Sequence, residues 1–311
     1  MNMNATMADD TLKIIVSFSA IAVIYCLVEM VRYWHRRNTH TSHKISHHPH
    51  QHLNEQEYEK SAAVIDYILK HEEALFKQPP PNEECPICFL TLPSMMTGRK
   101  YKSCCGKIIC SGCIHAVQIM DNDAKCPFCR VPISKSSEVT VRRIMKRVEV
   151  DDAYAICDLG LCYYNGERGL PQDRDKALEL LHRAGELGSA SAYYNIGHAY
   201  YRGRGVERDT EKAKHYLELA AIGGHEEARY NLGIFEEKGG NMSIALKHYM
   251  IAAGCGYDLS LKKIRKFHLN GHATKDDYAK ALQAYQTYVD EIKSDQRDEA
   301  AAFNSEKYRY Y

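Results

Sequence analysis

Eight of the twelve cysteines in the chain lie between residues 85 and 129, in four close pairs: Cys85/Cys88, Cys104/Cys105, Cys110/Cys113 and Cys126/Cys129. Thiolates in such pairs are typical ligands of structural zinc, and eight of them are enough for two tetrahedral ions. A secreted disulfide scaffold would be short and rich in cysteine throughout, whereas this chain has 311 residues and one dense cluster. We therefore expect two Zn²⁺ ions in a reducing compartment.

Three motifs in this segment resemble a RING finger: C-P-I-C at the start, C-G-x-x-x-C-x-x-C-I in the middle and C-P-F-C-R at the end. The resemblance implies a cross-braced module over residues 84–133, in which alternate ligand pairs hold one ion. Carried over, the first zinc would bind Cys85, Cys88, Cys110 and Cys113, and the second Cys104, Cys105, Cys126 and Cys129. The resemblance also implies a reaction without a covalent intermediate on this protein, so no catalytic residue is expected. Another zinc fold, such as a ribbon or a LIM-like tandem, is the alternative.

The stretch KSCCGKIICSGC (102–113) departs from the family pattern, because Lys107 stands where the family has a histidine ligand. A protonated amine has no lone pair to donate. Cys104 is the nearest replacement, but neighbouring sulfurs can approach to about 3.8 Å only where the backbone turns. Gly106 would favour such a turn. The rival ligand is His115, two residues after Cys113.

RING fingers act as ubiquitin ligases by binding a ubiquitin-charged conjugating enzyme and positioning its thioester for attack. The family's contact surface maps onto Ile87, Val117, Pro127 and Arg130. Val117 occupies the place of a frequent tryptophan, so that match preserves only apolar character. The alternative for Ile87 and Val117 is that they merely cover the zinc sites.

The elements that would position this module begin with an apolar run, LKIIVSFSAIAVIYCLVEMV (12–31). Twenty helical residues span about 30 Å, the thickness of a bilayer core. With the aromatic residues that come after it, the run predicts a transmembrane anchor over 12–34 after a short tail (1–11). Arg32, Arg36 and Arg37 would place the rest of the chain in the cytosol. A signal peptide and a buried helix are the alternatives.

Two segments separate this run from the cysteines. Residues 35–53 are polar and histidine-rich, which predicts a solvated spacer, with weak metal binding as the alternative. Residues 54–78 have helical composition and stop at three prolines. Behind the module, residues 138–150 predict a basic helix whose Val141, Ile144, Met145 and Val148 dock on the first repeat. The near-zero net charge gives no indication of nucleic-acid binding.

A repeat occupies residues 151–292. Segments such as AYYNIGHAYYRGRG and EKAKHYLELAAIGG recur, with Gly160, Gly197 and Gly233 spaced 37 and 36 residues apart. The pattern resembles Sel-1-like repeats, which implies a helix-pair solenoid of about four units (153–189, 190–225, 226–257 and 258–292) before a C-terminal tail (293–311). Such solenoids bind proteins or peptides.

Together these patterns predict a mainly α fold: a transmembrane helix, a small two-zinc module and a C-terminal α-solenoid. The function we expect is that of a RING-type ubiquitin ligase, single-pass in a membrane with module and repeats in the cytosol. Its repeats would recruit substrates or partner proteins. The alternative is a zinc-stabilised, membrane-anchored scaffold or adaptor without catalytic activity.

Overall fold

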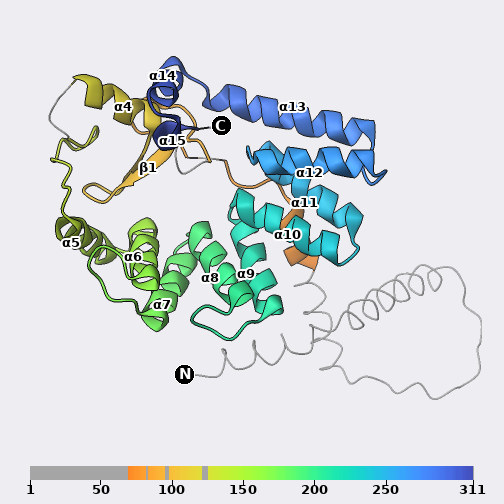
Figure 1. Cartoon of the computed structure of the whole chain (residues 1–311), viewed down its shortest axis with the longest axis horizontal. Coiled ribbons are helices and arrows are strands. Elements are labelled where there is room, and N and C mark those ends of the chain that lie inside the picture. Colours follow the sequence, from red (N-terminus) through yellow and green to blue (C-terminus); the bar gives the residue numbers. More distant parts are fainter. Residues whose placement is uncertain (1–68, 82, 95–97, 121–124, 311) are drawn as a thin grey trace, which may run out of the picture. The chain divides into compact units, whose positions relative to one another are not determined.

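The computed structural model describes residues 69–81, 83–94, 98–120 and 125–310. All of them belong to one compact unit. The described part is mainly helical, with a two-stranded sheet near its beginning and helix pairs following one another from α6 to α13 (Figure 1). The predicted N-terminal tail, the anchor over 12–34 and the histidine-rich spacer fall outside the described residues.

The predicted fold class and membrane location are corrected. Within the described ranges, no helix combines the length and apolarity needed to cross a bilayer. The longest of their labelled helices, α13 (Lys275–Ile292), has only Ala281, Tyr288 and Ile292 buried and carries charged side chains along its length. The described residues therefore show a mainly helical protein with a repeat solenoid, and they contain no transmembrane helix that would support the single-pass location.

The cysteine-rich module is built on a short hairpin and one helix. Strands β1 (Arg99–Lys102) and β2 (Lys107–Cys110) pair antiparallel, with Arg99 opposite Cys110 and Lys102 opposite Lys107. Helix α4 (Ser111–Met120) comes directly after β2 and buries its first five residues. Because this core is small, the cysteines themselves and Leu92, Ile109 and Ile114 make up most of its buried side chains.

Helix α5 (Ser137–Val148) connects the module to the repeats and packs on α6. Ser136 caps its first turn, as expected for a serine before an amphipathic helix. Val141 and Ile144 are buried and Val148 packs against the same core as Ile144, as predicted. Met145 is instead 40% exposed and is not among the residues that pack against this core.

Four helix pairs form the solenoid, and each helix packs on the next one along the chain (Figure 1). The pairs are α6 (Ala153–Asn165) with α7 (Arg174–Glu186), α8 (Ala190–Arg202) with α9 (Thr210–Ile222), α10 (Glu226–Lys238) with α11 (Met242–Gly254), and α12 (Asp258–Leu269) with α13.

The repeated glycine has a packing reason. A Cβ atom on Gly197 would lie 3.1 Å from the Ala213 carbonyl oxygen, and one on Gly233 would lie 2.5 Å from the Tyr249 ring. At Gly233 the two helices of the pair leave no room for a Cβ atom, and at Gly160 and Gly197 such an atom would be in tight contact with the partner helix, at 3.3 and 3.1 Å. The regular spacing of Gly160, Gly197 and Gly233 in the sequence follows from this close contact between the two helices of each pair.

The first helix of each pair starts at a corresponding position. Asp152, Ser189 and His225 cap α6, α8 and α10 by accepting hydrogen bonds from backbone N–H groups in the first turn. Tyr257 precedes α12 without a side-chain cap. The first three repeat units thus have three different residue types at the same N-cap position.

The described part of the predicted 54–78 helix covers residues 69–76. It docks on the repeats: Leu75 is buried with Leu217 and Leu232, and the Arg229 guanidinium donates to the Leu75 carbonyl. His71 Nε2 lies 3.1 Å from a Glu218 carboxylate oxygen. This segment therefore belongs to the packing of the solenoid.

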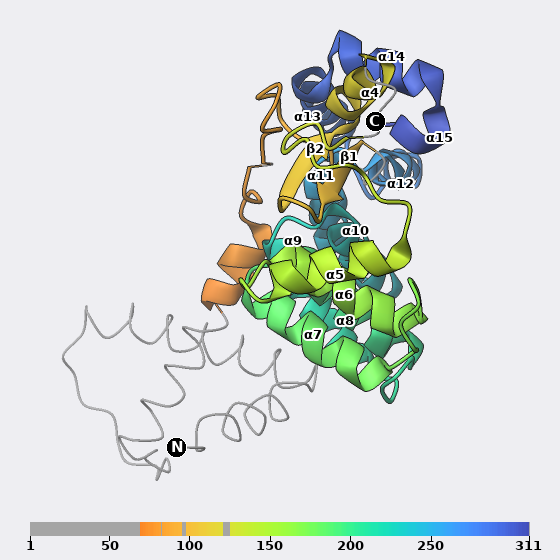
Figure 2. The ribbon, with the colours of Figure 1, turned by 90° about the vertical axis from the view of Figure 1, so that its left-hand side faces the viewer.

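The residues predicted as a C-terminal tail are folded. They form α14 (Asp295–Phe303) and α15 (Ser305–Tyr308), and α14 packs on α4 of the cysteine-rich module, as Figure 1 and Figure 2 both show. Ala300 and Tyr308 are part of the module's core, and Tyr310 is buried with Tyr288 and Ile292. The chain after residue 293 therefore completes the module.

Candidate metal centre

The structure gathers the eight cysteines into two groups of four: Cys85, Cys88, Cys110 and Cys113 in one, and Cys104, Cys105, Cys126 and Cys129 in the other. Within each group the sulfurs all lie within 4.8 Å of one another. Cys88 and Cys110 are 3.8 Å apart, and Cys105 and Cys126 are 3.9 Å apart. A tetrahedral Zn²⁺ with thiolates at about 2.3 Å needs sulfurs about 3.8 Å apart. Both groups could therefore hold a metal ion.

The two C-P-x-C motifs adopt the same turn. In the first, Cys85 N donates to Leu90 O and Phe89 N donates to Cys85 O; in the second, Cys126 N donates to Val131 O and Arg130 N donates to Cys126 O, all at 2.9 Å. Phe89 and Arg130 both have left-handed backbones, with φ of 58° and 62°. Each turn presents its two sulfurs on one side, which is how a pair of thiolates shares one ion.

The neighbouring Cys104 and Cys105 are brought into one group by a turn between β1 and β2. Cys105 N and Gly106 N both donate to Lys102 O, at 3.1 and 2.8 Å, and Gly106 has φ +70°. Side chains of adjacent residues can face the same point only where the strand is interrupted in this way. Cys104 Sγ lies 3.4 Å from Cys129 Sγ.

His115 belongs to neither group. It lies on the buried side of α4 with its ring 4.8 Å from Phe303 and 5.5 Å from Tyr308, and its Nε2 has no hydrogen-bond partner among the described residues. Lys107 is exposed, with Nζ 5.9 Å from the Phe128 ring centroid. Of the two rival ligands, the structure places Cys104 beside the other three sulfurs.

The expected conjugating-enzyme contacts come from three separate segments. Ile87 in the first turn is partly buried against the module core, Val117 is partly buried on α4, and Pro127 in the second turn is buried. Arg130 is exposed. Large apolar side chains of the same segments are open to solvent: Phe89 (72%), Ile119 (65%), Met120 (87%) and Phe128 (45%). The module therefore presents apolar surface around both C-P-x-C turns and at the end of α4.

A charged network joins the module to the first repeat. The Asp152 carboxylate caps α6 and also accepts hydrogen bonds from Tyr101 Oη at 2.7 Å and Arg147 Nε at 2.9 Å. Burial, with the Asp152 hydrogen bond as the next cause, raises the pKa of the Tyr101 phenol. The Arg147 guanidinium lies against Gly106, so a Cβ added there would collide with it. Tyr101 therefore stays a neutral donor to Asp152.

Helix α14 places two polar side chains beside the first cysteine group that the sequence did not predict there. Gln296 Oε1 lies 3.9 Å from Cys113 Sγ, and Arg297 Nη2 lies 4.0 Å from Cys88 Sγ. The serine-capped, alanine-containing stretch SDQRDEAAAF (294–303) is a helix signal that could have been recognised. Nothing in it predicts that Arg297 is buried against the cysteines.

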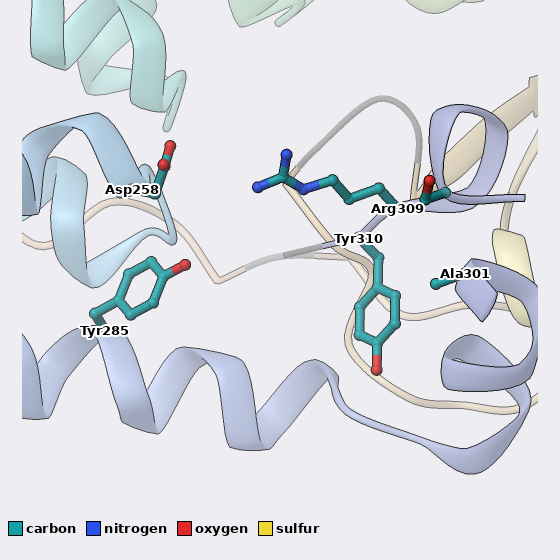
Figure 3. Close-up of a pocket in the computed structure, with 6 residues that line it drawn as sticks. Asp258, Tyr285, Ala301, Arg309 and Tyr310 are labelled. Atoms are coloured by element: carbon teal, nitrogen blue, oxygen red, sulfur yellow. The ribbon is translucent and has the colours of Figure 1, made fainter.

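Two surface hollows of the described residues contain no group of metal ligands. The first, of about 330 Å³, lies between α12, α13 and the chain end, with Asp258 and Tyr285 on one side and Arg309 and Tyr310 on the other (Figure 3). Its one carboxylate, Asp258, already pairs with Lys262 at 3.0 Å. The second, of about 480 Å³, runs along the Gly106 turn and includes Glu83, Glu84, Asp152 and Tyr154. Neither hollow brings a nucleophile to a base.

Family comparisons agree with the repeats. A family model described as Sel1 repeat matches residues 153–189 and 190–225, the first two predicted units, so the chain contains Sel1 repeats. A second model, described as SIP5 protein N-terminal domain, matches residues 19–138, which include both cysteine groups. Neither description names a RING finger. No curated protein matches the chain.

Solved structures of similar proteins include a Sel1 repeat protein from Oxalobacter formigenes (26% identity, 50% of this chain and 64% of that chain, TM-score 0.44). Others are c5321, a protective antigen of uropathogenic Escherichia coli strains displaying an SLR fold (24%, 53% and 36%, 0.42), and the immunity protein Pa5087 from Pseudomonas aeruginosa (21%, 61% and 67%, 0.37). The chain thus covers less than two thirds of the first two proteins. The assignment of the repeats to the Sel1 family therefore rests on the family model and on the observed helix pairs.

The class of protein is therefore defined by its repeats: a Sel1-repeat protein, suited to protein–protein interaction, that carries two cysteine groups able to hold metal ions.

Proposed function

We propose that the protein is a RING-type ubiquitin ligase whose zinc module binds a ubiquitin-charged conjugating enzyme and whose Sel1 repeats recruit a substrate or partner protein. The observation that carries the proposal is the interleaving of the two cysteine groups: the first and third pairs along the chain form one group and the second and fourth form the other. This is the cross-brace that the RING resemblance implies, with Cys104 in the place of the missing histidine.

Zn²⁺ in these groups would supply structural stabilisation, because the module's own core is small. The chain's own residues would do the positioning. Ile87 and Val117 would give an apolar contact to the conjugating enzyme, Pro127 would shape the groove between them, and the exposed Arg130 would reach the bound ubiquitin. Catalysis of this kind lowers the barrier by holding the thioester in a reactive geometry.

The test is self-ubiquitination of the purified full-length chain with ubiquitin, activating enzyme and a panel of conjugating enzymes. We expect ubiquitin chains with at least one conjugating enzyme, and their loss in Ile87→Ala and Arg130→Ala with zinc content unchanged. The matched control is Arg142→Ala, because Arg142 is an exposed arginine of α5 that pairs with Glu138 of its own helix. If no conjugating enzyme supports activity of the unmodified chain, the protein is a non-catalytic, zinc-stabilised adaptor.

A further inference from the structure

The C-terminal segment 294–310 reaches the first cysteine group through the start of α14. A Cβ atom on Gly112 would lie 2.9 Å from Arg297 N, so the backbone of α14 is in contact with the C-S-G-C turn that supplies Cys110 and Cys113. Tyr308 Oη donates to Gln118 Oε1 of α4 at 2.6 Å. This contact places one side chain, Arg297, inside the module.

The Arg297 side chain is fully buried (0% exposed). Nη1 donates to the carbonyls of Thr91, at 2.9 Å, and Ile292. Nη2 lies 4.0 Å from Cys88 Sγ, and Nε has no hydrogen-bond partner among the described residues. In the described part of the chain, no carboxylate lies within ion-pair distance of the Arg297 guanidinium. An arginine stays charged in proteins, so a negative charge beside this buried cation would stabilise it.

A metal-loaded cysteine group would supply such a charge. Four thiolates and one Zn²⁺ carry a net charge of about −2, whereas four protonated thiols carry none. Hydrogen-bond donors beside ligating sulfurs orient them and stabilise their charge. The sulfur spacing of the first group fits a tetrahedral ion, and Arg297 lies beside one of its ligands.

Another buried arginine shows what distinguishes this one. Arg229 is also almost fully buried, and its guanidinium donates to the carbonyls of Leu75 and Ala221. Burial lowers its pKa to about 10. Carbonyl oxygens can therefore hold a guanidinium without metal. Arg297 differs because one end of its guanidinium lies at a ligand sulfur and its Nε has no acceptor in the described part of the chain.

We propose that Arg297 is the counter-charge of the metal-loaded first cysteine group, so that metal binding there and docking of the C-terminal segment 294–310 stabilise each other. Coupling of this kind is reciprocal: if the ion strengthens docking by a given factor, docking strengthens ion binding by the same factor. The inference needs metal in the first group, which is part of the proposed function, but it does not need ligase activity.

The first experiment measures zinc release from the full-length chain as a chelator of known affinity is titrated. Arg297→Met keeps the length of the side chain and removes its charge, and we expect the dissociation constant of one of the two ions to rise about 10- to 100-fold. Arg297→Lys retains the charge and should lose less. The control Arg229→Met should change neither ion. Unchanged release from Arg297→Met would overturn the proposal.

The second experiment measures hydrogen exchange of the unmodified chain with zinc bound and after zinc is stripped, so it does not depend on a variant that folds poorly. Amides of α14 should exchange about tenfold faster or more without zinc, while those of α8 and α9 stay protected. Continued protection of α14 in the stripped protein contradicts the coupling. A chain that fails as a ligase yet shows both effects would refute the proposed function alone.

Discussion

Gly112 and Arg297 lie so close that a Cβ atom added to the glycine would come within 2.9 Å of the arginine backbone nitrogen. Both residues sit in helices, α4 and α14, that are separated by the whole solenoid in the sequence. The contact therefore joins the end of the chain to the cysteine-rich module, and it leaves room at residue 112 for glycine alone.

Gly112→Ala should displace α14, because the nearest obstructing atom is the backbone nitrogen of Arg297, which cannot rotate away. We expect a loss of about 1–3 kcal/mol in the free energy of unfolding and faster hydrogen exchange in α14. The control is Gly254→Ala in α11, where the new methyl group would meet only Ala284 at an ordinary 3.7 Å. Equal stability of the two variants would argue against the contact.

Cys104→Ser should reduce the zinc content of the purified chain from two ions to one, because serine is a poor ligand and the second group would keep only three thiolates. His115→Ala should keep both ions, since His115 lies against Phe303 and Tyr308. Native mass spectrometry gives the count. Cys255→Ser, in neither group, serves as control. A loss of zinc in the histidine variant instead would mean that the ligand assignment is wrong.

Asp152→Ala should destabilise the protein by about 2–4 kcal/mol, because it removes a helix cap and leaves Tyr101 and Arg147 without their acceptor. Asp209 provides the comparison: it caps α9 in the same manner, but its side chain is 36% exposed against 9% for Asp152, so Asp209→Ala should lose only about 1 kcal/mol. Urea denaturation measures both. Similar losses would show that the link to Tyr101 contributes nothing.

His225 should make the solenoid sensitive to acid. Its Nδ1 accepts the capping hydrogen bond of Ala228 N, and burial lowers its pKa to about 4, below the unfolded value of about 6.5. The folded state therefore binds fewer protons, so its stability is complete above about pH 6.5 and falls toward about pH 4. From about pH 7 to about pH 5 we expect a loss of about 1–2 kcal/mol from this residue.

His225→Ser tests that expectation, because serine caps α8 at the corresponding position and does not titrate. The variant should lose about 1–2 kcal/mol less than the unmodified chain between about pH 7 and about pH 5, measured by urea denaturation at both values. His248, whose pKa burial lowers to about 3, titrates in the same direction and remains in both proteins. An identical pH dependence of the two would refute the role of the cap.

The sequence alone determined what depends on residue type and local spacing. Cysteine pairs within a few residues of one another predict metal ligands, and glycines and alanines at a fixed period predict helix pairs, because both patterns are set by contacts between near neighbours in the chain. The helix pairs, α5 and the turn at Gly106 were all predicted in this way, and the Sel1 family of the repeats was predicted from their resemblance to it. The predicted membrane anchor lies outside the described residues, and those residues contain no helix able to span a bilayer.

The tertiary structure decided which distant groups meet. Nothing in the spacing of residues 293–311 indicates that Arg297 reaches Cys88, since 209 residues separate them. The capping Asp152 could be predicted as a helix start but not as the acceptor for Tyr101. Local sequence patterns encode secondary structure and short-range ligand pairs, whereas a buried charge finds its counter-charge only when the whole chain has packed.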